Sequence, residues 1–222
     1  MLYGGMELDD LRKRVTGEEF DYQMFMDVLR EYDRPRAKIG AQLKKKSIIR
    51  VKKGLYVFGE TLARRPFSRE VLANLIYGPS YISLEYALHH HGLIPERVES
   101  VTSCTLGRGR EFSTPIGHFS YHQIPAAAYA LGIDQVDSNT DRSFLIATPE
   151  KALADKLYAD RGTAITSPED LRTYVSSHLR IDLAELVHMK ASLMARIAAA
   201  YRSRKIRWLS MLIGEPKGKK KP

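Results

Sequence analysis

The sequence of 222 residues has little of what disulfide-stabilised, zinc-binding or membrane proteins need. Its single cysteine, Cys104, can form no intrachain disulfide and has no second thiol beside it for a zinc site, which fits a reducing cytoplasm. Residues 1–10 contain acidic side chains and no apolar core of a signal peptide. The longest stretch without charge, residues 112–133, contains two prolines and two glycines and is a poor membrane span. We therefore expect a soluble, cytoplasmic protein with no membrane partner.

The sequence also lacks the patterns of common cofactor sites. It has no internal repeat, and residues 107–110 (GRGR) are not followed by the helix that a phosphate-binding loop needs, so they indicate a basic turn. The three histidines of residues 89–91 point about 100° apart on a helix and cannot share one ion. His118 and His122 lie on one face of a predicted strand, without a third ligand at a suitable spacing. We expect neither a metal nor a cofactor.

Positive charge is abundant and unevenly placed. The chain has 35 basic and 26 acidic residues, a formal net charge of +9. Residues 1–70 carry 16 basic and 11 acidic side chains, residues 71–195 carry 10 and 14, and residues 196–222 carry 9 and 1. Between Arg34 and Lys53 there are nine basic residues and no acidic one. This distribution favours contact with a polyanion through part of the molecule.

Apolar spacing predicts three short helices at the start of the chain. Apolar residues recur at helical intervals in residues 8–15 and again in residues 22–29. Pro35 is suited to the first turn of a third helix, which we expect to end near Lys45. The third helix therefore lies inside the basic window.

A β-hairpin is predicted directly after these helices. Residues 48–51 and 55–58 are two β-prone runs, and Gly54 in the connection between them can adopt a positive φ. Three helices followed by a hairpin is the order of a winged helix-turn-helix domain. We assign this domain to residues 1–62.

The third helix and the hairpin are the predicted DNA-binding surface. Helical rotation turns Ile39 and Leu43 inward and leaves basic residues on the outer face around Ala37 and Ala41, which are small enough for close approach to a major groove. We expect the cations to meet phosphates and Gln42, at the flank, to read a base edge. The predicted DNA-binding residues are Arg34, Arg36, Lys38, Gln42, Lys44, Lys45, Arg50, and Lys52 and Lys53 at the wing tip.

The rest of the chain predicts a second, mixed α/β domain over residues 68–213, after a linker at residues 60–67. Ser68 caps a helix to residue 76, and Gly92 ends a helix that starts at residue 83. Alternating residues at 98–105 and β-prone runs at 111–114 and 118–124 indicate an antiparallel meander. The fold class is thus α+β.

The C-terminal end of this domain is predicted to be helical. An apolar strand at residues 144–147 leads into the helix start Thr148-Pro149-Glu150, and residues 167–170 repeat that start signal. A long amphipathic helical stretch is expected over residues 192–213. Residues 214–222 form a basic tail that we expect to be disordered.

An enzymatic alternative depends on four residues, Glu85, Glu150, Lys151 and Asp155. Carboxylates and a lysine around a strand are the components of a metal-dependent nuclease centre. However, Glu150 lies in a first helical turn, and Asp155 follows Lys151 by four residues, the spacing of an ordinary helical ion pair. We therefore expect no enzyme, and keep a nuclease-like protein directed to DNA by the winged helix as the alternative.

Three segments resemble a known family: residues 49–59 (IRVKKGLYVFG), residues 72–88 (LANLIYGPSYISLEYAL) and residues 146–155 (IATPEKALAD). Their order and spacing, with residues 92–96 and 112–115 between them, are similar to the AbiEi-type antitoxins of type IV toxin–antitoxin systems. The likeness covers residues 20–213. The three adjacent histidines and the lysine-rich tail depart from it.

This resemblance implies a transcriptional autoregulator that represses its own promoter by binding repeats in double-stranded DNA with its winged helix. It also implies that the C-terminal domain counters a nucleotidyltransferase-like toxin without a stable complex between the two proteins. No toxin-binding residue follows from it. A solitary transcription factor without a toxin stays open as a further alternative.

Overall fold

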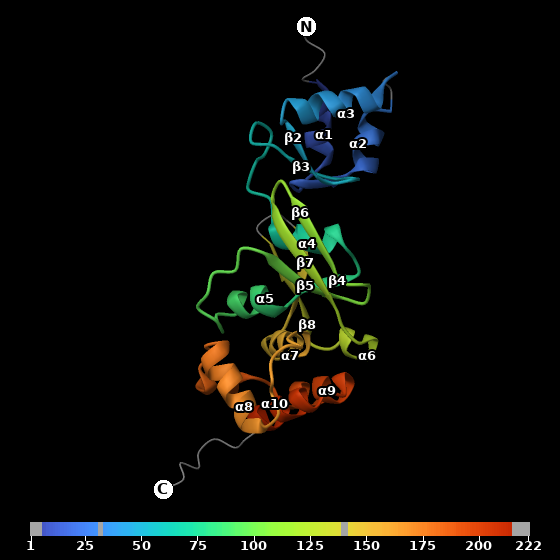
Figure 1. Cartoon of the computed structure of the whole chain (residues 1–222). Helices are drawn as coiled ribbons and strands as arrows, with labels where there is room; N and C mark the ends of the chain where they lie inside the picture. The colour runs from blue at the N-terminus through green and yellow to red at the C-terminus, as the bar shows by residue number, and fades with distance from the viewer. Residues whose placement is uncertain (1–5, 31–32, 139–141, 215–222) are drawn as a thin grey trace. The chain divides into compact units, whose positions relative to one another are not determined.

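The computed structural model describes residues 6–30, 33–138 and 142–214 (Figure 1). It is a mixed α+β structure, as the sequence predicts. Of the predicted basic tail, residues 215–222 lie outside the described residues. Among the described helices, none is both long enough and apolar enough to cross a membrane.

The chain divides into two compact units, each made of more than one segment. Unit 1 comprises Met1–Gly78, Ser113–Gly117 and Val136–Phe144, and unit 2 comprises Pro79–Phe112, His118–Gln135 and Leu145–Pro222. This division differs from the predicted boundary at residues 60–67.

Unit 1 contains the three predicted helices and the predicted hairpin. They are α1 (Met6–Arg14), α2 (Tyr22–Val28), α3 (Pro35–Lys44), β2 (Ile48–Lys52) and β3 (Leu55–Phe58). A further strand that the sequence does not predict, β1 (Glu19–Asp21), has three residues and pairs antiparallel with β3. The resulting three-stranded sheet has the order β1-β3-β2.

The core of unit 1 is an apolar cluster closed by one buried ion pair. Phe20 stands at its centre, with its ring centroid 4.7 Å from that of Phe58 and 5.8 Å from that of Phe25. Arg12 and Glu18 form an ion pair of 2.5 Å at the edge of this cluster, and the Arg12 guanidinium lies over the Phe58 ring. The cluster consists of Leu11, Val15, Phe20, Phe25, Leu29, Ile39, Ile48, Tyr56 and Phe58.

Two glycines set the geometry around the hairpin. Gly54 in the turn has a φ of 89°, the left-handed conformation that the sequence predicts there. Gly59 follows β3, and a Cβ at this position would stand 1.9 Å from the carbonyl oxygen of Lys46. The end of the hairpin can therefore pack against the turn after α3 only because residue 59 has no side chain.

Helix α4 (Arg69–Ile76) also belongs to unit 1, although it follows the predicted domain boundary at residues 60–67. As predicted, the Ser68 hydroxyl caps it by accepting from the Val71 amide at 3.1 Å. The buried carboxylate of Glu19 accepts from the Ser68 amide at 3.0 Å, and Lys52 of the hairpin donates to the carbonyl of Ile76. These bonds attach both ends of α4 to the three-stranded sheet. They explain why α4 belongs to unit 1 and why the boundary falls after Gly78 and not at residues 60–67.

A second sheet has six strands in the order β6-β7-β5-β4-β9-β8. Strand β4 pairs antiparallel with β5 and parallel with β9, and β5 pairs parallel with β7. The predicted antiparallel meander is therefore wrong, because β7 lies between β5 and β6. The strands are β4 (Ser80–Ile82), β5 (Val101–Thr105), β6 (Arg110–Thr114), β7 (Gly117–Gln123), β8 (Ile133–Asp137) and β9 (Ser143–Ala147).

Side-chain character explains this order. The central strand β5 is buried on both faces, so its alternating sequence pattern does not indicate that one face is exposed to solvent. Strand β7 buries Phe119 and Tyr121, whereas β6 exposes Arg110 and Glu111. A strand with exposed charges suits the edge of a sheet, where it also discourages pairing with other chains.

Helices cover this sheet and form the C-terminal end of the chain. The predicted starts at Thr148 and Ser167 are confirmed by side-chain caps, and Gly92 (φ 71°) follows α5 as predicted. The helical stretch predicted over residues 192–213 is divided into two helices, because Arg202 takes a left-handed φ of 51° and α10 folds back on α9. The helices are α5 (Leu84–His90), α6 (Ala126–Tyr129), α7 (Pro149–Ala159), α8 (Pro168–Thr173), the π-helical η1 (Tyr174–His178), the 3₁₀ turn η2 (Leu183–His188), α9 (Ala191–Tyr201) and α10 (Arg204–Gly214).

Candidate nucleic-acid interface

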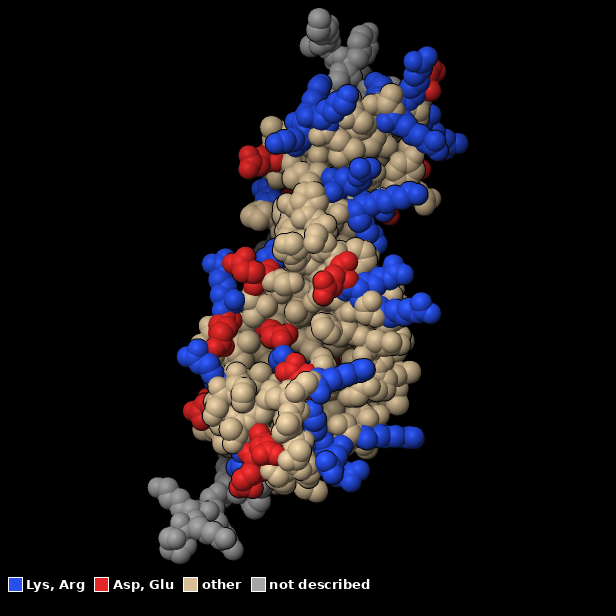
Figure 2. Space-filling view, viewed as in Figure 1, with Lys and Arg blue, Asp and Glu red and all other residues tan. Residues whose placement is uncertain are grey.

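Helix α3 of unit 1 presents a basic outer face. Pro35 occupies its first turn, where the missing amide proton costs nothing, and Ile39 anchors the inner face in the core. The side chains that line the outer face are exposed: Arg34, Arg36, Ala37, Ala41, Lys44 and Lys45. Figure 2 shows lysine and arginine side chains gathered over the part of the molecule formed by α3, with few acidic side chains among them.

Two lysines of this region, Lys38 and Lys46, differ from the prediction in whether they are exposed for contact with a ligand. Lys38 is half-buried and has an interaction partner within the protein. Lys46, which the sequence analysis left out of the predicted set, is exposed directly after α3 in a left-handed conformation. The run of three lysines at residues 44–46 was the signal that could have included it.

Gln42 does not flank the basic face, so the prediction that it reads a base edge is wrong. Its side chain is 4% exposed, and its Oε1 accepts no hydrogen bond from the described residues. Ile39 and the half-buried Leu43 pack on the core as predicted, and Gln42 also faces the core, so the inner side of α3 is wider than predicted. Packing of α3 on the first two helices thus takes precedence over the polarity of Gln42.

The hairpin supplies two exposed cations, not three. Arg50 on β2 and Lys53 in the turn are exposed. Lys52 points back to α4, where its ammonium donates to the Ile76 carbonyl, and burial lowers its pKa. Lys52 therefore attaches the turn end of the hairpin to α4 and is not available as a phosphate contact.

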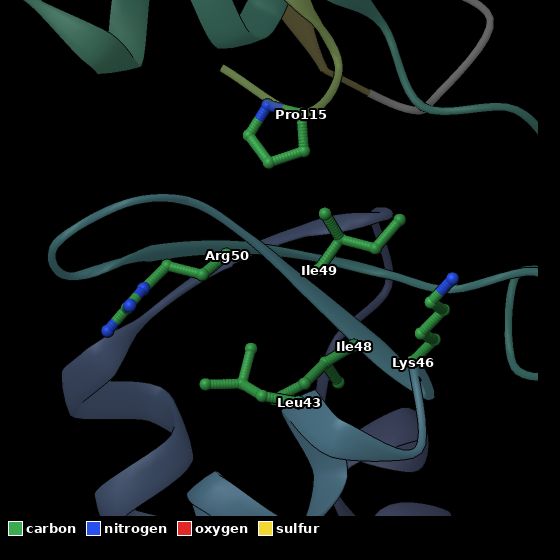
Figure 3. Close-up of a pocket in the computed structure, with 6 residues that line it drawn as sticks. All are labelled: Leu43, Lys46, Ile48, Ile49, Arg50 and Pro115. Carbon is green, nitrogen blue, oxygen red and sulfur yellow. The ribbon is translucent and has the colours of Figure 1, made fainter.

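An open pocket of about 450 Å³ lies between the end of α3 and strand β2. In Figure 3 the apolar side chains of Leu43 and Ile48 lie on one side of the pocket and Pro115 on the opposite side, while Lys46 and Arg50 extend in different directions. The two cations therefore do not converge on one small ligand. The lining residues, all of unit 1, are Leu43, Lys46, Ile48, Ile49, Arg50 and Pro115.

The four residues of the enzymatic alternative do not share one accessible site. Lys151 and Asp155 form the predicted helical ion pair, at 2.9 Å, but both side chains are 0% exposed. Glu85 pairs with Lys156 at 2.7 Å, and Glu150 accepts from the backbone amide of Lys190 at 2.6 Å. A substrate cannot reach the buried pair without an opening of unit 2.

Asp155 instead organises a buried polar network. Its carboxylate accepts from Tyr81 at 2.8 Å, from Ser83 at 2.6 Å and from the Tyr201 hydroxyl. The ammonium of Lys151 also donates to Tyr201 at 2.9 Å and lies over its ring. Burial and the nearby carboxylate raise the pKa of both tyrosines. The network joins residues 81–83, helix α7 and helix α9 of unit 2 and has the character of a structural centre.

The histidines have separate surroundings. The His91 ring nitrogen Nε2 lies 2.7 Å from the Ala147 carbonyl, so it is held by the backbone of β9. His118 and His122 are both exposed on β7. Within residues 6–30, 33–138 and 142–214, no group of three or more His, Cys, Asp or Glu side chains is arranged to hold a metal ion.

Comparison with known proteins adds no relative to this description. No protein-family model matches the chain, and no curated protein sequence matches it. The function must therefore be argued from the residues of the chain itself.

Proposed function

We propose that residues 6–58 of unit 1 form a winged helix-turn-helix that binds double-stranded DNA. The observation that carries this proposal is the outer face of α3, where exposed cations surround Ala37 and Ala41 and no acidic residue intervenes. Small residues at the centre let the helix approach base edges closely, and the cations at its margins match the two phosphate backbones of a groove. The order of three helices and a hairpin supports this assignment.

The hairpin β2–β3 acts as the wing in this proposal. Arg50 and Lys53 contact phosphates beside the groove that receives α3. The bond from Lys52 to α4 and the close packing of Gly59 on the Lys46 carbonyl fix the wing relative to α3. Because the wing is already fixed, no conformational entropy is lost in ordering it when α3 and the wing bind the duplex together.

We further propose that the protein is an AbiEi-type antitoxin that represses its own promoter. This part is supported by the sequence resemblance over residues 20–213. Its partner would be a nucleotidyltransferase-like toxin encoded beside it, countered through the C-terminal part of the chain without a stable complex. The buried Lys151–Asp155 pair agrees better with a structural role than with catalysis.

A gel-shift titration tests the DNA-binding proposal. The probe is the duplex that precedes the coding sequence of this chain, and the variant is Lys44→Ala/Lys45→Ala/Lys53→Ala. We expect the variant to bind at least tenfold more weakly, since each lost phosphate contact reduces the electrostatic part of the affinity. Unchanged affinity would exclude α3 and the hairpin as the DNA-binding elements.

A growth assay with the full chain tests the antitoxin proposal separately. The same triple variant is expected to lose repression of a reporter under its own promoter but to rescue cells that express the neighbouring toxin. Loss of rescue together with repression would mean that toxin neutralisation works through α3 and the hairpin. Failure of the wild-type chain to rescue would leave a transcription factor without antitoxin function.

A further inference from the structure

Helix α10 of unit 2 has one buried and one outward side. The buried side chains Ile206, Leu209 and Ile213 recur at three- and four-residue intervals, and α10 packs with α9 as a helical pair (Figure 1). The opposite side carries Arg204, Arg207, Trp208 and Met211, again at helical spacing. All of these are exposed except Trp208, which is half-buried.

The outward side carries positive charge that none of the described residues neutralises. The sequence has no acidic residue between positions 196 and 214. Arg202, exposed in the turn before α10, and the exposed Arg204 and Arg207 have no ion pair or side-chain hydrogen bond with any described residue. By contrast, Lys205 donates to the carbonyls of Asp160 and Thr163 at 3.3 and 3.2 Å. The three arginines are therefore available to an external anion.

An aromatic ring stands among these arginines. The Arg204 guanidinium lies over the Trp208 ring, with its Cζ 5.0 Å from the ring centroid. A guanidinium stacked on an indole keeps its planar donors free at the edge and presents a flat surface on which a further ring can stack. Guanidinium groups bind phosphates with paired hydrogen bonds, a geometry that ammonium groups do not provide.

We propose that Arg202, Arg204, Arg207 and Trp208 form a binding surface for single-stranded nucleic acid. The arginines hold successive phosphates, and an unpaired base stacks on the Arg204–Trp208 pair. A duplex cannot offer such a base because its bases are stacked on one another. An anionic membrane fits less well, since Met211 is the one large apolar side chain well exposed on this side of α10 among the described residues. The surface lies wholly in unit 2 and does not depend on the function proposed for α3.

Trp208 is the only tryptophan of the chain, so its fluorescence reports on this surface alone. Full-length protein is titrated with a short oligouridylate and, in a second arm, with the matching oligodeoxythymidylate. We expect saturable quenching in at least one arm, and the ratio between the arms tells whether RNA or DNA is preferred. No change of Trp208 fluorescence with either oligonucleotide would overturn the proposal. So would a change that only vesicles of anionic phospholipid produce.

Variants separate specific binding from net charge. Binding of a labelled oligonucleotide, measured by anisotropy, should weaken at least tenfold in Arg204→Gln/Arg207→Gln and about tenfold to a hundredfold in Trp208→Leu, while Trp208→Phe keeps most of the affinity. The matched control is Arg97→Gln/Arg180→Gln, which removes the same charge from arginines already paired with Glu99 and Glu96. An equal loss in the control would contradict a defined site. Loss only in the Lys44/Lys45/Lys53 variant would place single-strand binding on α3.

Discussion

Replacing Asp155 by alanine should destabilise unit 2 more than any single change on its surface. The carboxylate is fully buried. It accepts hydrogen bonds from the hydroxyls of Tyr81, Ser83 and Tyr201 and forms an ion pair with Lys151. Asp155→Ala leaves the Lys151 ammonium buried without a counter-charge, in contact with the Tyr201 hydroxyl and the rings of Tyr201 and Tyr81. It also leaves three hydroxyls without their acceptor. Removing one member of a buried ion pair costs about 3 to 5 kcal/mol, much of a small unit's stability.

Cys104 provides the assay, because it is the only cysteine and is fully buried in unit 2. Burial and the nearby Asp155 carboxylate raise the pKa of the thiol, so it reacts with an alkylating reagent only when the unit opens. A loss of 3 to 5 kcal/mol corresponds to labelling about 150- to 5000-fold faster at equal reagent concentration, since about 1.4 kcal/mol is a factor of ten.

The double variant Lys151→Met/Asp155→Leu is the control. It leaves no unpaired charge and refills the space, so it should label more slowly than Asp155→Ala although the hydroxyls still lack an acceptor. Labelling of Asp155→Ala within tenfold of the wild-type rate would refute a stabilising network. Faster labelling of the double variant than of the single one would refute the argument from the unpaired ammonium.

Three further predictions concern unit 1. Gly59→Ala should cost about 1 to 3 kcal/mol in a denaturant titration, because the Lys46 carbonyl must move; an unchanged midpoint would contradict the close approach. Gln42→Met should raise the free energy of unfolding by about 1 kcal/mol and leave DNA affinity unchanged; weaker DNA binding would restore Gln42 as a base-reading residue. Burial raises the pKa of Glu19, so the folded state binds its proton more tightly and wild-type stability falls as the pH rises above about 4.5; Glu19→Gln should remove this decline in parallel melts, and identical pH profiles would contradict it.

Local features of the fold could be predicted because short sequence signals determine them. The caps Ser68, Thr148 and Ser167 and the turn glycine Gly54 act through neighbours two to four residues away, and the structure has each of them as predicted. Strand order depends on pairing between distant segments, for which the sequence has no local signal. The parallel pairing of β5 with β7 and the three-residue strand β1 were therefore missed.

For the candidate site, too, the sequence predicts local features better than packing between distant segments. Charge correctly predicted most of the exposed cations on α3 and the hairpin, because cations usually stay at the surface, but it did not predict the half-buried Lys38 or the bond from Lys52 to α4. The width of the inner side of α3 depends on how three helices fit together, so polarity alone wrongly put Gln42 outside. Likewise, the spacing of Lys151 and Asp155 predicted their ion pair, but the Tyr201 hydroxyl reaches Asp155 from 46 residues away. No periodicity in the sequence predicts a contact between residues so far apart.

The salt dependence of duplex binding tests most directly whether α3 and the hairpin hold DNA through their cations. Affinity for the upstream duplex is measured by anisotropy between 50 and 200 mM salt for the wild type, for Lys44→Ala/Lys45→Ala/Lys53→Ala and for the control Arg97→Ala/Arg161→Ala/Arg180→Ala. Each phosphate contact contributes about 0.9 to the slope of log K against log salt concentration. We expect a slope shallower by about 2 to 3 in the lysine variant and an unchanged slope in the control. Equal slopes in all three proteins would contradict this expectation.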